Sequence, residues 1–145
     1  MKTFLYHAQI NVSDAARSIP FYRALFDYFE YRVLVDARDL LGVSNGTTDF
    51  WLIETPGDRR AAAFHRKNTG LNHLAFGVGE RAHVDRFVAE FLGPRGIAAL
   101  YDSPREYPEY HAGYYAAFFE DPDRLKLEVA HVPTITDHNL LRLHS

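Results

Sequence analysis

The chain has 145 residues, 47% of them hydrophobic and 24% charged, which suits a soluble protein with the core of about one ordinary domain. Its net charge of −3 leaves no basic excess for phosphates, so nucleic acid is excluded as a partner, and the absence of Cys excludes disulfides and thiolate metal sites. No stretch approaches the ~20 apolar residues of a membrane helix and the N-terminus has no signal-peptide pattern, so we expect a cytoplasmic protein that does not bind membranes.

An internal repeat organises the chain. When the sequence is shifted so that His7 falls on His73, roughly twenty residues of each copy match in apolar pattern without a gap. Such self-similarity predicts two copies of one supersecondary unit.

The first copy begins with an alternating strand around His7, which places His7, Gln9 and Asn11 on one face. A helix should follow, capped by Ser13 or Asp14, with Pro20 kinking or shortening its start. Three short strands complete this copy, and we expect them at Tyr31–Val35, Leu40–Val43 and Asp49–Glu54.

The second copy repeats this order. A strand around His73 precedes a helix from about Glu80 to Leu92, which Gly93, Pro94 and Gly96 should end. The three strands expected after it are Ile97–Tyr101, Tyr114–Phe119 and Leu125–His131.

Strands mixed with single helices predict an α+β fold. We expect one domain over residues 1–133, built from two βαβββ modules at about 1–60 and 70–131 that form a cup-shaped mixed sheet. Residues 134–145 should form a C-terminal tail.

Three polar side chains from distant strands share the face opposite the helices. His7 and His73 begin the first strand of each copy, and Glu128 stands between the apolar Leu127 and Val129 of the last strand. Two imidazoles and a carboxylate suit a divalent ion with open positions for water or substrate. Lys126 lies on the same face and offers Glu128 an alternative partner.

The ordered motifs of the chain resemble those of the vicinal-oxygen-chelate superfamily, which includes glyoxalase I, extradiol dioxygenases, fosfomycin-resistance enzymes and bleomycin-binding proteins. The resemblance rests on His7 with Val12 and Asp14, on the run Asn72–Val78, and on Phe119 with Asp121-Pro122-Asp123 and Leu127-Glu128. It implies that His7, His73 and Glu128 bind a divalent metal such as Zn, Ni, Mn or Fe. It also implies a small-molecule substrate and a homodimer.

Two residues of the fourth strand, Glu54 and Trp51, are alternative candidates for the face that lines the cup. The repeat nominates Glu54, since Ile53-Glu54-Thr55 resembles Leu127-Glu128-Val129, and glyoxalase I uses a Glu of this strand as a fourth ligand. Fosfomycin-type relatives place a Trp there, which would be Trp51. In a regular strand the two positions have opposite parity, so only one can face the cup.

Further substrate-binding residues are expected from Asn11 and from a Tyr-rich connection. This connection offers Tyr107, His111 and Tyr115 as a pocket wall. Arg124 stands where the family turn usually has Gly, so the turn should be altered or mildly strained, and its guanidinium could bind an anionic ligand.

The resemblance implies first a glyoxalase-like lyase or isomerase, in which a metal binds adjacent substrate oxygens and Glu54 moves the proton. An extradiol-type Fe(II) dioxygenase is the first alternative, with His111 or Tyr115 as acid–base group. A fosfomycin- or bleomycin-type resistance or binding protein is the second.

Overall fold

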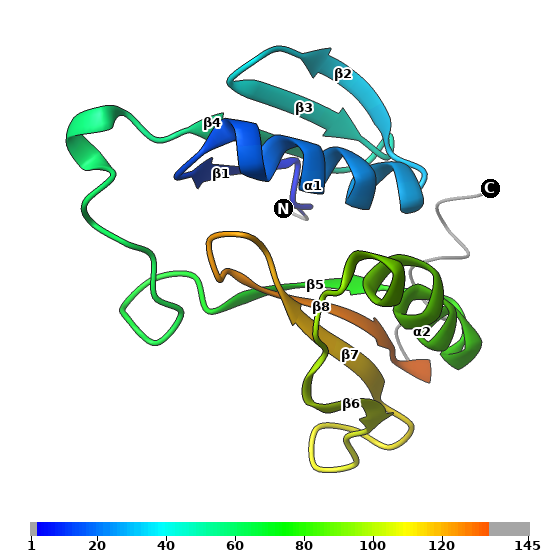
Figure 1. The fold of residues 1–145 in the computed structure, drawn as a ribbon. Helices are drawn as coiled ribbons and strands as arrows, with labels where there is room; N and C mark the ends of the chain where they lie inside the picture. Colours follow the sequence, from blue (N-terminus) through cyan, green and yellow to red (C-terminus); the bar gives the residue numbers. More distant parts are fainter. Residues whose placement is uncertain (1–2, 134–145) are drawn as a thin grey trace. The chain divides into compact units, whose positions relative to one another are not determined.

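The computed structural model describes residues 3–133, so the expected tail at 134–145 lies outside the described residues. The chain divides after Phe64 into two compact units, and each unit contains one of the modules expected from the repeat. Each unit folds around its own four-stranded sheet (Figure 1).

The first unit holds one helix and one four-stranded sheet. Its elements are β1 (His7–Val12), α1 (Ala15–Tyr28), β2 (Arg32–Asp36), β3 (Leu40–Ser44) and β4 (Asp49–Glu54), followed by the 3-10 turn η1 (Gly57–Arg59). The strand order is β1-β4-β3-β2, with β1 and β4 parallel and the other neighbours antiparallel.

The second unit repeats this plan. Its elements are β5 (His73–Gly77), α2 (Arg81–Phe87), the π-helical turn η2 (Val88–Leu92), the 3-10 turn η3 (Gly93–Arg95), β6 (Leu100–Glu106), β7 (Tyr115–Glu120) and β8 (Lys126–His131). The strand order is β5-β8-β7-β6, again with only the first pair parallel. The predicted α+β fold of two βαβββ modules is therefore confirmed.

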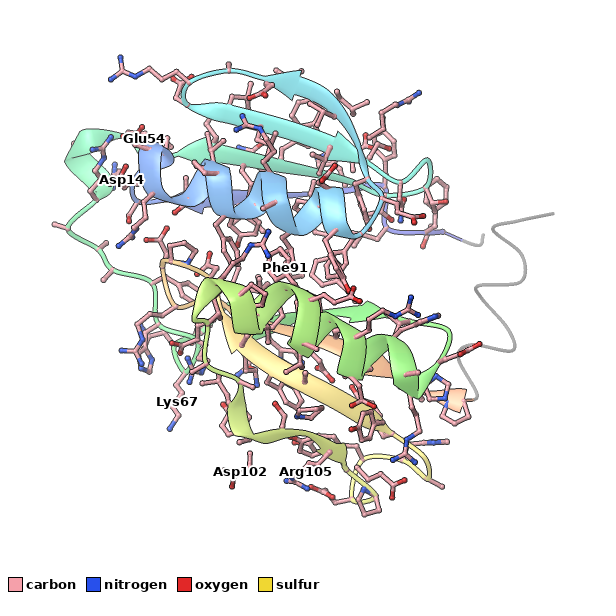
Figure 2. All side chains as sticks on the ribbon, turned by 45° about the vertical axis from the view of Figure 1, so that its right-hand side comes forward. Asp14, Glu54, Lys67, Phe91, Asp102 and Arg105 are labelled. Atoms are coloured by element: carbon pink, nitrogen blue, oxygen red, sulfur yellow. The ribbon has the colours of Figure 1, made fainter. Side chains whose placement is uncertain are left out.

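Helix α1 starts where the sequence indicates. The Asp14 side chain accepts a hydrogen bond from the backbone N–H of Ala16 at 2.9 Å, which satisfies one of the free donors of the first turn. Figure 2 shows Asp14 at this end of the helix. Pro20 lies inside the helix, which nevertheless begins at Ala15, directly after Asp14, so the expected shortening of its start is wrong.

The second helix changes character before it ends. Its α-helical part stops at Phe87, and a π-helical turn carries the chain to Leu92, with the Gly93 N–H bonded to the Val88 carbonyl five residues earlier. Pro94 explains this widening, because in an α-helix its ring would clash with the Glu90 carbonyl. Gly96 then turns the chain with φ +63°.

In each unit the helix covers one face of the sheet. In the first unit, Phe26 of α1 packs on Phe50 of the sheet. In the second unit, Phe87 of α2 packs on Phe119 of the sheet. Each helix thus buries alternate strand residues, and the residues between them occupy the opposite face. On this opposite face the second unit has its own buried cluster, consisting of Tyr107, Ala116, Phe118, Ala130 and Val132.

One strand lies later than expected. The sequence predicts it at 97–101, whereas β6 covers Leu100–Glu106 and takes in part of the Tyr-rich connection. Tyr101 and Asp102 have φ values of +59° and +54°, and the pairing with β7 shifts register between Leu100 and Arg105. Such an irregularity leaves no alternating pattern to read in the sequence.

Candidate metal centre

His73 and Glu128 meet on the sheet face opposite α2. They come from the parallel strands β5 and β8, where Glu128 is the register partner of Ala75. His73 Nε2 lies 3.2 Å from Glu128 Oε2, and Glu128 is only 1% exposed. The alternation predicted for β8 is therefore correct, with the buried Leu127 and Val129 on the α2 side.

Asn72 fixes the orientation of the imidazole. Its side-chain oxygen lies 2.8 Å from His73 Nδ1, so this nitrogen donates its N–H to the amide oxygen. When the ring is neutral, the proton on Nδ1 leaves the lone pair of Nε2 directed toward Glu128. An oriented imidazole of this kind is typical of a metal ligand.

Tyr114 contacts the same carboxylate from the other side. Its hydroxyl donates to Glu128 Oε1 at 2.5 Å. Burial, and then the hydrogen bond to Glu128, raise the pKa of Tyr114 well above its usual range, so the phenol stays protonated and remains a donor. The sequence places Tyr114 in the Tyr-rich connection but does not show where its side chain points. Tyr114 lies four residues before Phe118, the register partner of Glu128, and this even spacing was the one signal that both side chains share a face.

The His73–Glu128 pair fits a divalent metal. Two ligands about 2.1 Å from an ion lie roughly 3.0–3.4 Å apart at octahedral and tetrahedral angles, and the Nε2–Oε2 distance of 3.2 Å falls within this span. Over the described residues, however, neither unit gathers three His, Asp or Glu side chains into a complete site. The second unit thus brings together two side chains whose spacing suits two ligands of one ion.

Lys126 contacts aromatic rings and not Glu128, the partner expected for it from the sequence. Its Nζ lies 5.4 Å from the centroid of the Phe118 ring and 5.7 Å from that of Tyr101. Both contacts are cation–π interactions, which hold an ammonium without a carboxylate. Glu128 has His73 and Tyr114 as its partners instead.

The first module places His7 on the equivalent strand. His7, Gln9 and Asn11 alternate along β1 as exposed residues, with the more buried Ala8 and Ile10 between them. Trp51 is the register partner of Gln9 and Gly42, so it lies on the face of His7. Its ring covers Gly42 so closely that a Cβ at this position would overlap it.

Glu54 lies on the other face. It is the register partner of Val12, which is fully buried on the α1 side, and the pairing of β4 with β1 continues to this residue without a bulge. Its carboxylate forms an ion pair with Arg60, six residues further along the chain. Figure 2 labels Glu54 at the end of β4. The structure therefore decides between the two candidates of this strand: Trp51, and not Glu54, shares the face of His7.

The three residues predicted from the Tyr-rich connection lie in three different surroundings. Tyr107 is 2% exposed and packs edge-on against Phe118, which makes it a core residue of this face. His111 is exposed, with Nδ1 2.8 Å from the Ala112 carbonyl oxygen. Tyr115 has the opposite parity from Tyr114 and faces α2, where its hydroxyl donates to Asp85 at 2.6 Å.

Arg124 stands at the turn position where the family usually has Gly, and it adopts the left-handed backbone conformation that Gly favours. Its φ is +67°, a left-handed conformation that strains an L-residue, so the expected strain is present. Its guanidinium is largely exposed and lies 3.4 Å from Glu120 Oε2. Asp121 holds the turn by accepting from the N–H groups of Asp123 and Leu125 at 2.8 and 2.7 Å.

Comparison with known proteins identifies the family. Residues 5–129 match the model of the Glyoxalase/Bleomycin resistance protein/Dioxygenase superfamily, so the chain belongs to this superfamily. The uncharacterized protein YqjT of Bacillus subtilis (strain 168) is 30% identical over 127 residues, which are 86% of this chain and 96% of YqjT. The resemblance seen in the motifs is confirmed.

Solved structures agree with this assignment. A candidate glyoxalase from Bacillus halodurans is 33% identical, with a TM-score of 0.80, and the match covers 88% of this chain and 95% of that one. Lactoylglutathione lyase from Agrobacterium tumefaciens is only 17% identical, with a TM-score of 0.65 over 92% of this chain and 96% of its own, and shows the fold alone. Within residues 3–133, no helix has both the length and the apolar character needed to cross a membrane.

Proposed function

We propose that this chain is a small-molecule metalloenzyme of the glyoxalase type, a lyase or isomerase acting on a substrate with adjacent oxygens. The observation that carries the proposal is the contact between the oriented imidazole of His73 and the buried carboxylate of Glu128. A buried carboxylate loses its hydration and gains most from a cation, and the oriented Nε2 lone pair adds a second ligand for one. His7, at the equivalent position of the first module, is proposed as the third ligand.

The residues around the pair would each have a part in the chemistry. A divalent ion bound here would supply Lewis acidity to the substrate oxygens. Asn72 would hold the tautomer of His73, and the protonated Tyr114 would orient Glu128. Phe118, the register partner of Glu128 on β7, packs against Tyr107, and these rings would keep this face of the sheet dry. For the first module we propose Trp51 and Asn11 as substrate contacts.

Glu54 is omitted from the proposal. Its register and its ion pair with Arg60 argue against a role as fourth ligand or as proton-transfer base. Without it, the ligand set consists of two His and one carboxylate. This set is typical of non-haem Fe(II) oxygenases, so an extradiol-type Fe(II) dioxygenase is the second candidate function.

Metal content and two assays test these proposals together. Elemental analysis and titration with Zn, Ni, Mn and Fe(II) should show bound metal in the wild type. The His73→Ala variant should lose that metal without unfolding, because His73 is partly exposed and its removal opens no cavity on the α2 side. His65→Ala, which changes an exposed His of the same unit, is the matched control.

The assays then separate the activities. Isomerisation of a hemithioacetal with Ni or Zn supports the lyase or isomerase, whereas oxygen consumption with catechols under Fe(II) supports the dioxygenase. A wild type that binds none of these metals contradicts both and favours a metal-free binding protein of the resistance type.

We also propose a homodimer. Each four-stranded sheet ends in two edge strands, β1 and β2 in the first unit and β5 and β6 in the second, and exposed edges favour pairing or shielding. Solution scattering at micromolar concentration tests this, and a mass equal to one chain would contradict it.

A further inference from the structure

The two oxygens of the Glu128 carboxylate have separate partners. Oε1 accepts the hydrogen bond of Tyr114 at 2.5 Å, and Oε2 faces His73 Nε2 at 3.2 Å. Glu128 is only 1% exposed, so its carboxylate is withdrawn from bulk water and these two contacts are its main partners. Its orientation is therefore set by these two residues.

Tyr114 is itself held in place. Its backbone N–H donates to the His111 carbonyl at 3.0 Å, and its own carbonyl accepts from the Tyr107 N–H at 2.9 Å. Its ring lies edge-on to Tyr110, with 5.6 Å between the centroids. The hydroxyl thus reaches Oε1 from a fixed backbone, and holding it there costs little further conformational entropy.

We propose that Tyr114 is a positioning residue that reserves Oε1 of Glu128 and leaves Oε2 as the oxygen available to a divalent ion. This inference rests on the proposed function. An ionised carboxylate oxygen accepts more than one partner, so the hydroxyl can stay on Oε1 while Oε2 acts as a ligand beside Nε2 of His73. Tyr114 would thereby favour binding through one carboxylate oxygen and keep that oxygen next to the imidazole.

The chain offers a matched pair of variants. Tyr114→Phe removes the hydroxyl on Glu128, and Tyr115→Phe removes the neighbouring hydroxyl, which is bonded to Asp85 on the α2 side. Both changes delete one phenol–carboxylate hydrogen bond in the same segment. Only the first concerns the proposed ligand.

Zinc affinity, measured by competition with a chromophoric chelator at pH 7.5, distinguishes the two. We expect Tyr114→Phe to bind zinc about 10- to 100-fold more weakly than the wild type, the usual loss for a group that orients a ligand. Tyr115→Phe should bind as the wild type does. Equal affinity in all three proteins would overturn the inference and leave the proposed function standing, whereas a wild type that binds no zinc would overturn both.

A second measurement does not depend on the folding of a variant. In a crystal structure of the zinc-loaded wild type, the Tyr114 hydroxyl should remain within hydrogen-bond distance of one Glu128 oxygen, with zinc on the other. Zinc bound to both carboxylate oxygens, or Tyr114 turned away from Glu128, would contradict the proposal.

Discussion

Trp51 occupies in the first module the register position that Glu128 occupies in the second. Trp51 pairs with Gln9, two residues after His7, and Glu128 pairs with Ala75, two residues after His73. Beside its first-strand histidine, one module therefore carries an indole and the other a carboxylate. The two copies keep the same frame but differ in chemistry.

This relationship also shows why the sequence nominates the wrong residue. The runs Ile53-Glu54-Thr55 and Leu127-Glu128-Val129 look alike, yet the six-residue strands β4 and β8 align so that Glu54 matches His131. Glu54 lies three residues after Trp51, the position that matches Glu128, and an odd spacing along a strand places it on the opposite face. Only the pairing register, which the sequence does not contain, reveals this.

The contact between Trp51 and Gly42 leads to the first prediction. A Cβ at position 42 would overlap the indole ring, so Gly42→Ala must displace the ring or the strand. We expect a loss of about 1–3 kcal/mol in the free energy of unfolding, as for overpacked sites. Trp51 is the one Trp of the chain, so its fluorescence emission should shift too. Gly57→Ala, which has open space around it, is the control, and an unchanged emission in Gly42→Ala would contradict this packing.

The strained turn at Arg124 allows a stabilising substitution. Gly adopts φ +67° without the cost of about 1–2 kcal/mol that an L-residue bears there, although its greater freedom in the unfolded chain offsets part of this gain. The Arg124 side chain is largely exposed, so its ion pair with Glu120 contributes little. Arg124→Gly should therefore raise the free energy of unfolding by about 0.5–1 kcal/mol in urea denaturation. Arg124→Ala loses the same ion pair and keeps the strain, so it should not raise the free energy of unfolding. An equal change in that free energy for the two variants would show that the strain is unimportant.

Tyr115 should make stability depend on pH in the alkaline range. The hydrogen bond to Asp85, and then burial, raise the pKa of Tyr115 to about 12, above its ordinary value of 10.0. A raised pKa in the folded state contributes stability that is complete below the unfolded value and is lost as the pH rises through the folded one. Tyr115→Phe should thus be less stable than the wild type at pH 8, and the difference should shrink from about pH 10 toward pH 12.

Urea denaturation at a series of pH values measures this difference. Tyr110→Phe, at an exposed ring of the same connection, is the reference for alkaline effects unrelated to Asp85. A difference between wild type and Tyr115→Phe that stays constant through pH 11 would contradict the proposed linkage.

Much of the second module can be anticipated from its pattern, and what cannot has physical causes. The apolar neighbours Leu127 and Val129 fix the direction of Glu128, so its face follows from alternation alone. Tyr114 is different, because its direction depends on where β7 begins after an irregular connection. Tyr115 follows one residue later and faces the other way, and a boundary shift of a single residue would exchange their roles.

Glu128 provides the last prediction, because both its charge and its neighbours can be tested at one position. Glu128→Gln keeps the shape of the side chain, and its amide oxygen can still accept the Tyr114 hydroxyl. We expect metal binding to be lost or greatly weakened, since a neutral amide is a much poorer ligand for a divalent ion than a carboxylate. Stability without metal should change by only about 1–2 kcal/mol, because the hydrogen bond to Tyr114 is retained while its charge assistance is lost.

Lys126→Met is the matched control for this variant. It removes the cation of the same strand face, which lies over Tyr101 and Phe118, and should leave metal content unchanged. Elemental analysis and thermal unfolding of both variants decide the matter. If Glu128→Gln retains its metal at full stoichiometry, Glu128 is a structural carboxylate held by Tyr114 and His73. If Lys126→Met loses metal as well, the packing of Lys126 on Tyr101 and Phe118, and not the Glu128 ligand alone, determines binding.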